Sequence, residues 1–74
     1  MTTKDIKAWV VQKASITKPY GKVWSASVTI GGMDINGVGD TIEKAYNDLT
    51  LYINQNSYYS TELQKILNRK TSNQ

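Results

Sequence analysis

Residues 23–36, with the sequence VWSASVTIGGMDIN, decide the fold of this 74-residue chain. Apolar side chains alternate with small polar ones on both sides of Gly31-Gly32, as in two antiparallel strands with one buried face. Two adjacent glycines can adopt the positive φ angles of a two-residue hairpin turn. The apolar face would carry Trp24, Ala26, Val28, Ile30, Met33 and Ile35, and the polar face Ser25, Ser27, Thr29, Asp34 and Asn36.

The segment before this hairpin predicts one more strand. Residues 8–16 are rich in aromatic and β-branched side chains, which favour strands. Residues 18–21, KPYG, are typical of a turn, because proline presets φ and glycine tolerates a positive φ. We therefore expect a three-stranded antiparallel meander whose first strand lies within residues 8–16.

The hydrophobic period changes from that of a strand to that of a helix at Asp40. One helical stripe is formed by Ile42, Ala45, Tyr46, Leu49, Tyr52 and Ile53. Asp40 or Thr41 would cap this helix, and Asp40 with Glu43 has the spacing of a capping box. Polar residues 54–57 would end it. A second helix, capped by Ser60 or Thr61, would carry Leu63, Ile66 and Leu67.

These elements predict an α+β fold of the order β-β-β-α-α. Both helices would pack on one face of the meander, because an apolar sheet face needs a cover. We expect a single small domain over residues 1–70. Residues 71–74 carry no apolar side chain, and we expect them to fray.

The composition excludes most enzyme classes. The chain has no cysteine and no histidine, so it cannot use a thiolate, a Ser–His pair or a histidine-ligated zinc. No apolar run approaches the ~20 residues of a membrane span. Its net charge of +3 is only mildly basic. We therefore expect a cytoplasmic, non-enzymatic protein without cofactor, metal or membrane contact.

Residues 23–53 contain a motif that is similar to known families. A strand led by Trp24 is followed by residues 37–41, GVGDT, and then by Ala45 within the helix. This pattern resembles the second half of a double-stranded-RNA-binding domain and the helix start of HicB-type antitoxins. Integrase arm-binding domains share its β-β-β-α order. The resemblance implies this fold and a function in binding.

Two features depart from the RNA-binding family. Its members carry lysines in the first turn of the helix, where this chain has a single lysine, Lys44, beside the acidic Glu43. The family also begins with a helix, for which we expect no room because the first strand begins near Ala8. We interpret residues 37–39 as a tight turn from strand to helix and not as a phosphate cradle, because the acidic first turn repels anions.

Basic and aromatic residues provide one candidate site, for nucleic acid. The turn tip carries Lys18, Tyr20 and Lys22, which could hold a phosphate and stack on a base, with Lys13 nearby. The end of the last helix is also basic, although cations there also compensate the helix dipole. The complete set is Lys13, Lys18, Tyr20, Lys22, Lys44, Lys65, Arg69 and Lys70.

Small polar and tyrosine side chains provide a second candidate site, for a protein partner. The set comprises Ser25, Ser27 and Thr29 on the polar sheet face, and Tyr52, Tyr58 and Tyr59 near the two helices. The tyrosines could instead fill the gap between the helices. We expect a small regulatory protein that occludes a protein partner, like an antitoxin or an inhibitor carried by a phage or mobile element. The alternatives are a duplex RNA- or DNA-binding module and a homodimer.

Overall fold

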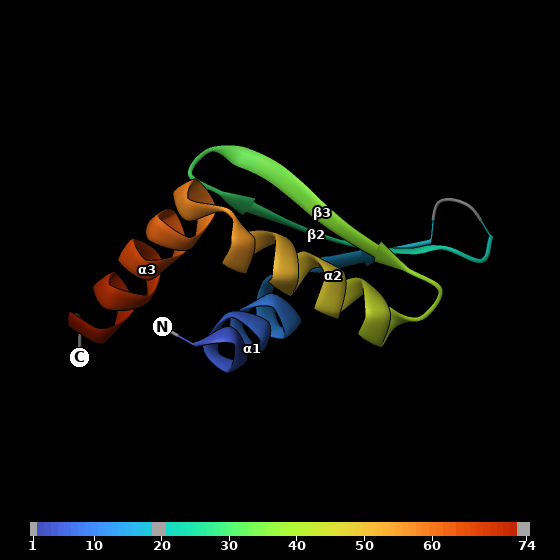
Figure 1. Cartoon of the computed structure of the whole chain (residues 1–74), viewed down its shortest axis with the longest axis horizontal. Helices are drawn as coiled ribbons and strands as arrows, with labels where there is room; N and C mark the ends of the chain where they lie inside the picture. Colours follow the sequence, from blue (N-terminus) through green and yellow to red (C-terminus); the bar gives the residue numbers. More distant parts are fainter. Residues whose placement is uncertain (1, 19–20, 73–74) are drawn as a thin grey trace.

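The computed structural model describes residues 2–18 and 21–72, with side chains as far as residue 69, and it shows an α+β fold. Its elements are, in chain order, α1 (Thr3–Lys13), β1 (Ser15–Thr17), β2 (Trp24–Ile30), β3 (Met33–Gly39), α2 (Ile42–Gln55) and α3 (Ser57–Ser72). The three helices lie on one side of the sheet (Figure 1). The meander and the two helices after it are confirmed, and a further helix precedes the strands.

The sheet is an antiparallel meander of order β1-β2-β3. β2 and β3 pair along their whole length, whereas β1 pairs only with residues 25–27 of β2. Gly31 and Gly32 form the turn between β2 and β3, with φ angles of 59° and 79°. Positive φ at both central residues is what a type I′ turn requires, so the predicted hairpin turn is confirmed.

The prediction of a strand over residues 8–16 is wrong for most of its length, because α1 occupies this part of the chain. A capping box begins the helix: the Thr2 hydroxyl accepts from the Asp5 amide at 3.2 Å, and the Asp5 carboxylate accepts from the Thr2 amide at 3.0 Å. The buried stripe of α1 consists of Ile6, Trp9 and Val10. The N-terminal helix, for which we expected no room near Ala8, is therefore present.

α2 packs across β2 and β3. Its buried apolar side chains are Ala45, Leu49 and Ile53. Thr41 is its N-cap, and the Thr41 hydroxyl accepts from the Lys44 amide at 3.1 Å. Asp40 and Glu43, expected to form a capping box, pair with lysines instead. Asp40 Oδ1 lies 3.0 Å from Lys44 Nζ, and Glu43 pairs with Lys7 of α1.

Two glycines allow α2 to pack directly on the backbone of β3. Gly37 lies inside β3 and Gly39 is its last residue, so our interpretation of residues 37–39 as a turn is wrong. A Cβ atom on Gly37 would lie 2.3 Å from Leu49 N, and a Cβ atom on Gly39 would lie 2.7 Å from Ala45 N. Both distances are far inside van der Waals contact, so any larger residue would push α2 away from the sheet.

α3 begins at Ser57, earlier than the expected Ser60 or Thr61. Asn56 Oδ1 accepts from the amides of residues 58 and 59 at 3.0 and 3.2 Å. The capping residue is therefore the asparagine that also ends α2.

The core lies between the sheet and the helices. Its buried apolar residues are Ile6, Trp9, Val10, Ala26, Val28, Ile30, Ile35, Ala45, Leu49, Ile53, Tyr59 and Leu63. Trp24, expected on this face, is half-buried against the cluster. α3 continues to Ser72, so the first two residues of the tail expected to fray are helical. Asn73 and Gln74 lie outside the described residues.

Candidate functional site

The face of the sheet opposite the helices, here called the outer face, carries the strand residues expected to meet a protein partner. It consists of Ser15 and Thr17 of β1, Ser25, Ser27 and Thr29 of β2, and Asp34, Asn36 and Val38 of β3. Asp34 is its one charged residue and Val38 its one apolar residue. None of the elements that the structure describes covers this face (Figure 1).

Hydrogen bonds between β2 and β3 orient four of the polar side chains of the outer face. Thr29 Oγ1 donates to Asp34 Oδ1 at 2.6 Å, and Asn36 Nδ2 donates to Ser25 Oγ at 3.2 Å. Ser25 is only 6% exposed, so its hydroxyl stabilises the sheet and does not reach a partner. Ser27 is half-buried and Thr29 is exposed, so these two β2 side chains are open to contact.

An open groove lies on the outer face where α1 leads into β1. Its volume is about 440 Å³, and it is lined by Lys13, Ser15, Ser27, Val28, Thr29 and Asp34. The groove exists because β1 pairs with only residues 25–27, so the end of β2 has no strand beside it. The groove brings Lys13, which was predicted to contact phosphate, together with Ser27 and Thr29, which were predicted to contact a protein.

The β1–β2 loop carries the lysines of the predicted turn tip. Lys18 Nζ lies 4.9 Å from the centre of the Trp24 ring, a cation–π contact. Lys22 is exposed, and Tyr20, the predicted stacking residue, lies outside the described residues. Lys13 is separated from Lys18 by the whole of β1, about 10 Å of strand. Lys13 therefore lies at the opposite end of β1 from the turn tip.

Two further predicted nucleic-acid residues are paired with acids. Lys44 pairs with Asp40, as described above, and Lys65 Nζ lies 2.9 Å from Glu62 Oε2. These exposed pairs contribute little to stability. They do lower the positive potential that either lysine would offer to a phosphate.

The basic end of α3 is remote from the β1–β2 loop. Arg69 is exposed on α3, and the side chain of Lys70 lies outside the described residues. The two regions occupy opposite ends of the molecule, whose longest dimension is 41 Å (Figure 1). The predicted basic residues therefore do not form one patch.

Three tyrosines meet where α2 passes into α3. The Tyr59 ring contacts Tyr52 and Tyr58 edge-to-face, with 5.6 and 5.4 Å between ring centres. Burial raises the pKa of Tyr59, and the neighbouring Tyr52 raises it further. Tyr58 Oη donates to Gly31 O at 3.0 Å, which joins α3 to the β2–β3 turn. Tyr52 and Tyr58 remain 44% and 51% exposed, so the cluster fills the gap between the helices and also presents two rings.

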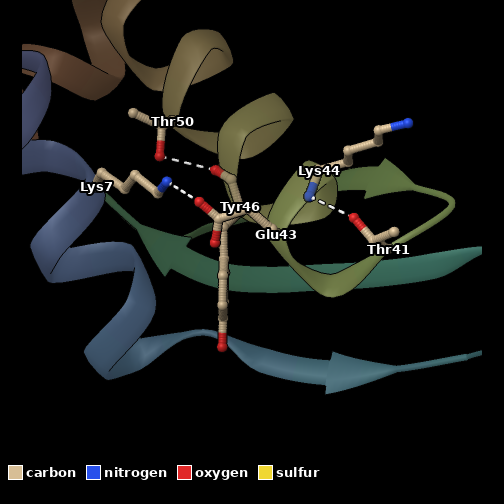
Figure 2. Close-up of polar contacts among 6 residues, drawn as sticks. All are labelled: Lys7, Thr41, Glu43, Lys44, Tyr46 and Thr50. Atoms are coloured by element: carbon tan, nitrogen blue, oxygen red, sulfur yellow. Dashed lines mark hydrogen bonds and ion pairs between the residues drawn. The ribbon is translucent and has the colours of Figure 1, made fainter.

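Two of the polar contacts in Figure 2, one between α1 and α2 and one within α2, were not predicted from the sequence. Lys7 of α1 forms an ion pair with Glu43 of α2. Next to it, the buried Thr50 donates its hydroxyl hydrogen to Tyr46 O at 2.8 Å. Lys7 and Glu43 are 36 residues apart in the sequence, and the packing of α1 against α2 brings them together. The helical stripe of α1 was the signal that could have found this contact.

The described part of the chain offers no site for a metal ion: no three of its Asp, Glu, His or Cys side chains come close enough to hold one. Within the same residues, no helix is long and apolar enough to cross a membrane. Every buried side-chain nitrogen or oxygen in these residues has a hydrogen-bond partner, so none is left aimed at a ligand.

Comparisons of the chain with protein-family models, with curated proteins and with solved structures found no match. The assignment of function therefore rests on the surfaces described above.

Proposed function

We propose that this chain is a small regulatory protein, without enzymatic activity, that occludes a protein partner by binding it through the outer face. The proposed setting is cytoplasmic, and the proposed role is that of an antitoxin or of an inhibitor carried by a phage or mobile element. The observation that carries the proposal is the outer face itself, which none of the described elements covers and which has one charged strand residue, Asp34. A partner can cover such a surface without desolvating many charges, which is the main penalty for burying polar protein surface.

The tyrosine cluster supports the same proposal. Tyr58 contacts the β2–β3 turn at one end of the sheet, and its ring is half exposed there. Aromatic side chains with a polar tip are enriched in protein interfaces, because they offer large area at low entropic cost. A partner on the outer face that extends past the turn would reach the Tyr58 ring.

One experiment tests the outer face. The immobilised chain is incubated with an extract of cells that naturally express it, and bound protein is recovered at about 50 and 500 mM salt. Capture is expected to survive the higher salt, because burial of the outer face would supply most of the affinity. Ser27→Arg, at the centre of the outer face, should abolish capture, and Thr61→Arg, the matched change on exposed α3, should not. Equal capture by both variants would count against the outer face.

Duplex RNA or DNA binding is the second candidate, and α1 is the observation that favours it. With this helix, the first five elements follow the order α-β-β-β-α, which removes one departure from the RNA-binding family. Lys18 and Lys22 of the β1–β2 loop would supply the phosphate contacts. The pairing of Lys44 and Lys65 with acids, and the distance between the loop and α3, favour the protein partner instead.

Fluorescence anisotropy separates this candidate from the first. Labelled duplexes are titrated at about 50 and 200 mM salt, because phosphate contacts weaken steeply over this interval. Our proposal predicts no binding even at the lower salt. If binding is seen, Lys18→Glu with Lys22→Glu should abolish it. Lys44→Glu with Lys65→Glu, which makes the same charge change elsewhere, should not.

A further inference from the structure

Along the edge of β3 that faces away from β2, some backbone groups have no partner among the described residues. The two-residue turn makes Ile30 and Met33 a hydrogen-bonded pair, so alternate residues of β3 direct their N–H and C=O groups toward β2. The intervening residues, Asp34, Asn36 and Val38, direct theirs away from the sheet. β3 is the last strand in the sheet order, so these groups point away from any described strand.

A side chain from α2 confirms this geometry at one of the three positions. The Val38 amide donates to Asp48 Oδ2 at 2.9 Å, so it does point outward and is already satisfied. In the described part of the chain, no side chain accepts from the amides of Asp34 or Asn36. The amides of Asp34 and Asn36 therefore remain available to donate, whereas that of Val38 is already bound to Asp48.

The β3 edge also differs in charge from the rest of the chain. Asp34 and Asp48 lie at its two ends, and neither has an ion-pair partner among the described residues. They place a carboxylate near each end of the edge, that of Asp34 also accepting from Thr29 of β2, although the chain carries a net charge of +3. Met33 and Val38, 52% and 48% exposed, add apolar surface at the same two ends.

We propose that this edge takes an extended segment of the partner protein as a fourth strand, with lysine or arginine side chains of the segment beside Asp34 and Asp48. Strand addition draws affinity from main-chain hydrogen bonds, which the open Asp34 and Asn36 groups can supply. The distance from Asp34 to Val38, about 13 Å of strand, fits a segment of four to five residues. This inference rests on the proposed protein-binding function and specifies which part of the partner is held.

A second copy of this chain fits the edge less well than a basic segment. Antiparallel pairing of two β3 edges about Asn36 would place Asp34 of one copy opposite Val38 of the other. Since Asp48 contacts the Val38 amide, the two carboxylates would meet across the junction. Like charges placed opposite each other in a sheet are destabilising. A lysine or arginine of a partner segment in that position would instead be attracted to the carboxylates of Asp34 and Asp48.

The test uses two blocked hexapeptides, one alternating lysine with valine and one alternating glutamate with valine. Binding is followed by NMR, through the hydrogen-exchange rates of the protein's amides. The lysine peptide should slow exchange at Asp34 and Asn36 and bind about tenfold more tightly than the glutamate peptide, because two exposed ion pairs separate them. Equal binding of the two peptides, or no slowing at these amides, would overturn the proposal.

Two variants at one position isolate the backbone donor. Asn36→Pro removes the outward N–H, which an edge strand tolerates because the bond to β2 is not affected. Asn36→Ala keeps that N–H, and both variants lose the hydrogen bond to Ser25. The alanine variant should bind the lysine peptide as the original chain does, and the proline variant should not. Should the proline variant fail to fold, Asp34→Asn with Asp48→Asn supplies the test, and undiminished affinity for the lysine peptide would overturn the proposal.

The same variants separate this inference from the proposed function. Capture of a protein at high salt that is lost with Ser27→Arg but kept with Asn36→Pro would overturn the edge and leave the outer face in place. Absence of any captured protein would overturn the proposed function instead, whatever the peptides do.

Discussion

Gly37 is the position where the fold tolerates a side chain least. A Cβ atom there would meet the backbone of α2, at 2.3 Å from Leu49 N and 2.7 Å from Ala45 O, and backbone cannot move aside as a flexible side chain can. We expect Gly37→Ala to lower the free energy of unfolding by about 3 kcal/mol, the upper end for overpacking a core. Urea denaturation measures it. Gly32→Ala is the control: its Cβ would meet nothing, and its positive φ should cost only about 1 kcal/mol. An equal loss in both variants would contradict the close packing.

Tyr59 gives the molecule a sensitivity to alkaline pH. Burial, followed by the effect of Tyr52, raises the pKa of Tyr59 in the folded state. The unfolded chain therefore loses this proton first, and stability falls as the pH rises above the ordinary tyrosine value of about 10. We expect thermal unfolding at alkaline pH to show a smaller decline in Tyr59→Phe than in the original chain. Tyr46→Phe, which lies outside the tyrosine cluster, should show the same decline in thermal stability as the original chain.

At the scale of elements, the sequence predicts the structure where its hydrophobic periodicity fits only one kind of element. The alternation of residues 23–36 predicted the β2–β3 hairpin, and the stripe from Ile42 to Ile53 predicted α2. α1 was missed because Trp9, Val10 and Val11 favour strands individually, whereas their run without alternation fits a helix. The capping box of Thr2 and Asp5 decides between the two. In α1 the capping box and the burial of a helical stripe therefore outweigh the strand propensity of the individual residues.

The α1 capping box makes a prediction of its own. Thr2→Ala removes the side chain that accepts from the Asp5 amide, and we expect a loss of about 1 kcal/mol in unfolding free energy. Thr3→Ala, in the exposed first position of the helix, should change stability little.

Asp5 adds a pH dependence to the same box. Hydrogen bonds from the Thr2 amide and from the Thr2 side chain lower the pKa of this carboxyl in the folded state. The ionised carboxylate therefore stabilises the folded state at pH values above the ordinary aspartate pKa of about 3.9. This stabilisation is lost as the pH falls through the lower pKa of the folded state. Circular dichroism in acid should show this loss in the original chain and a smaller one in Asp5→Asn. Identical acid profiles would show that the carboxylate does not stabilise α1.

At the scale of the whole molecule, the sequence located the outer face but not its boundaries. Alternation alone placed Ser27 and Thr29 opposite the core. It could not show that Ser25 would be buried by its neighbours, or that Lys13 would line the same groove, because both depend on where β1 begins. The sequence also could not predict that the basic residues lie far apart, because tertiary packing sets the positions of α3 and the β1–β2 loop.

The negative charge beside the β3 edge should determine whether the protein remains a monomer in solution. We expect the original chain to sediment as a monomer at two concentrations about tenfold apart, because self-pairing would bring Asp34 of one copy close to Asp48 of another. Asp34→Asn with Asp48→Asn removes that repulsion and should produce a concentration-dependent dimer. Asp5→Asn with Glu62→Gln removes the same charge away from the edge and should leave the monomer unchanged. Adding Asn36→Pro to the first pair should restore the monomer, because the edge then lacks its central donor; a dimer that persists would have formed through another surface.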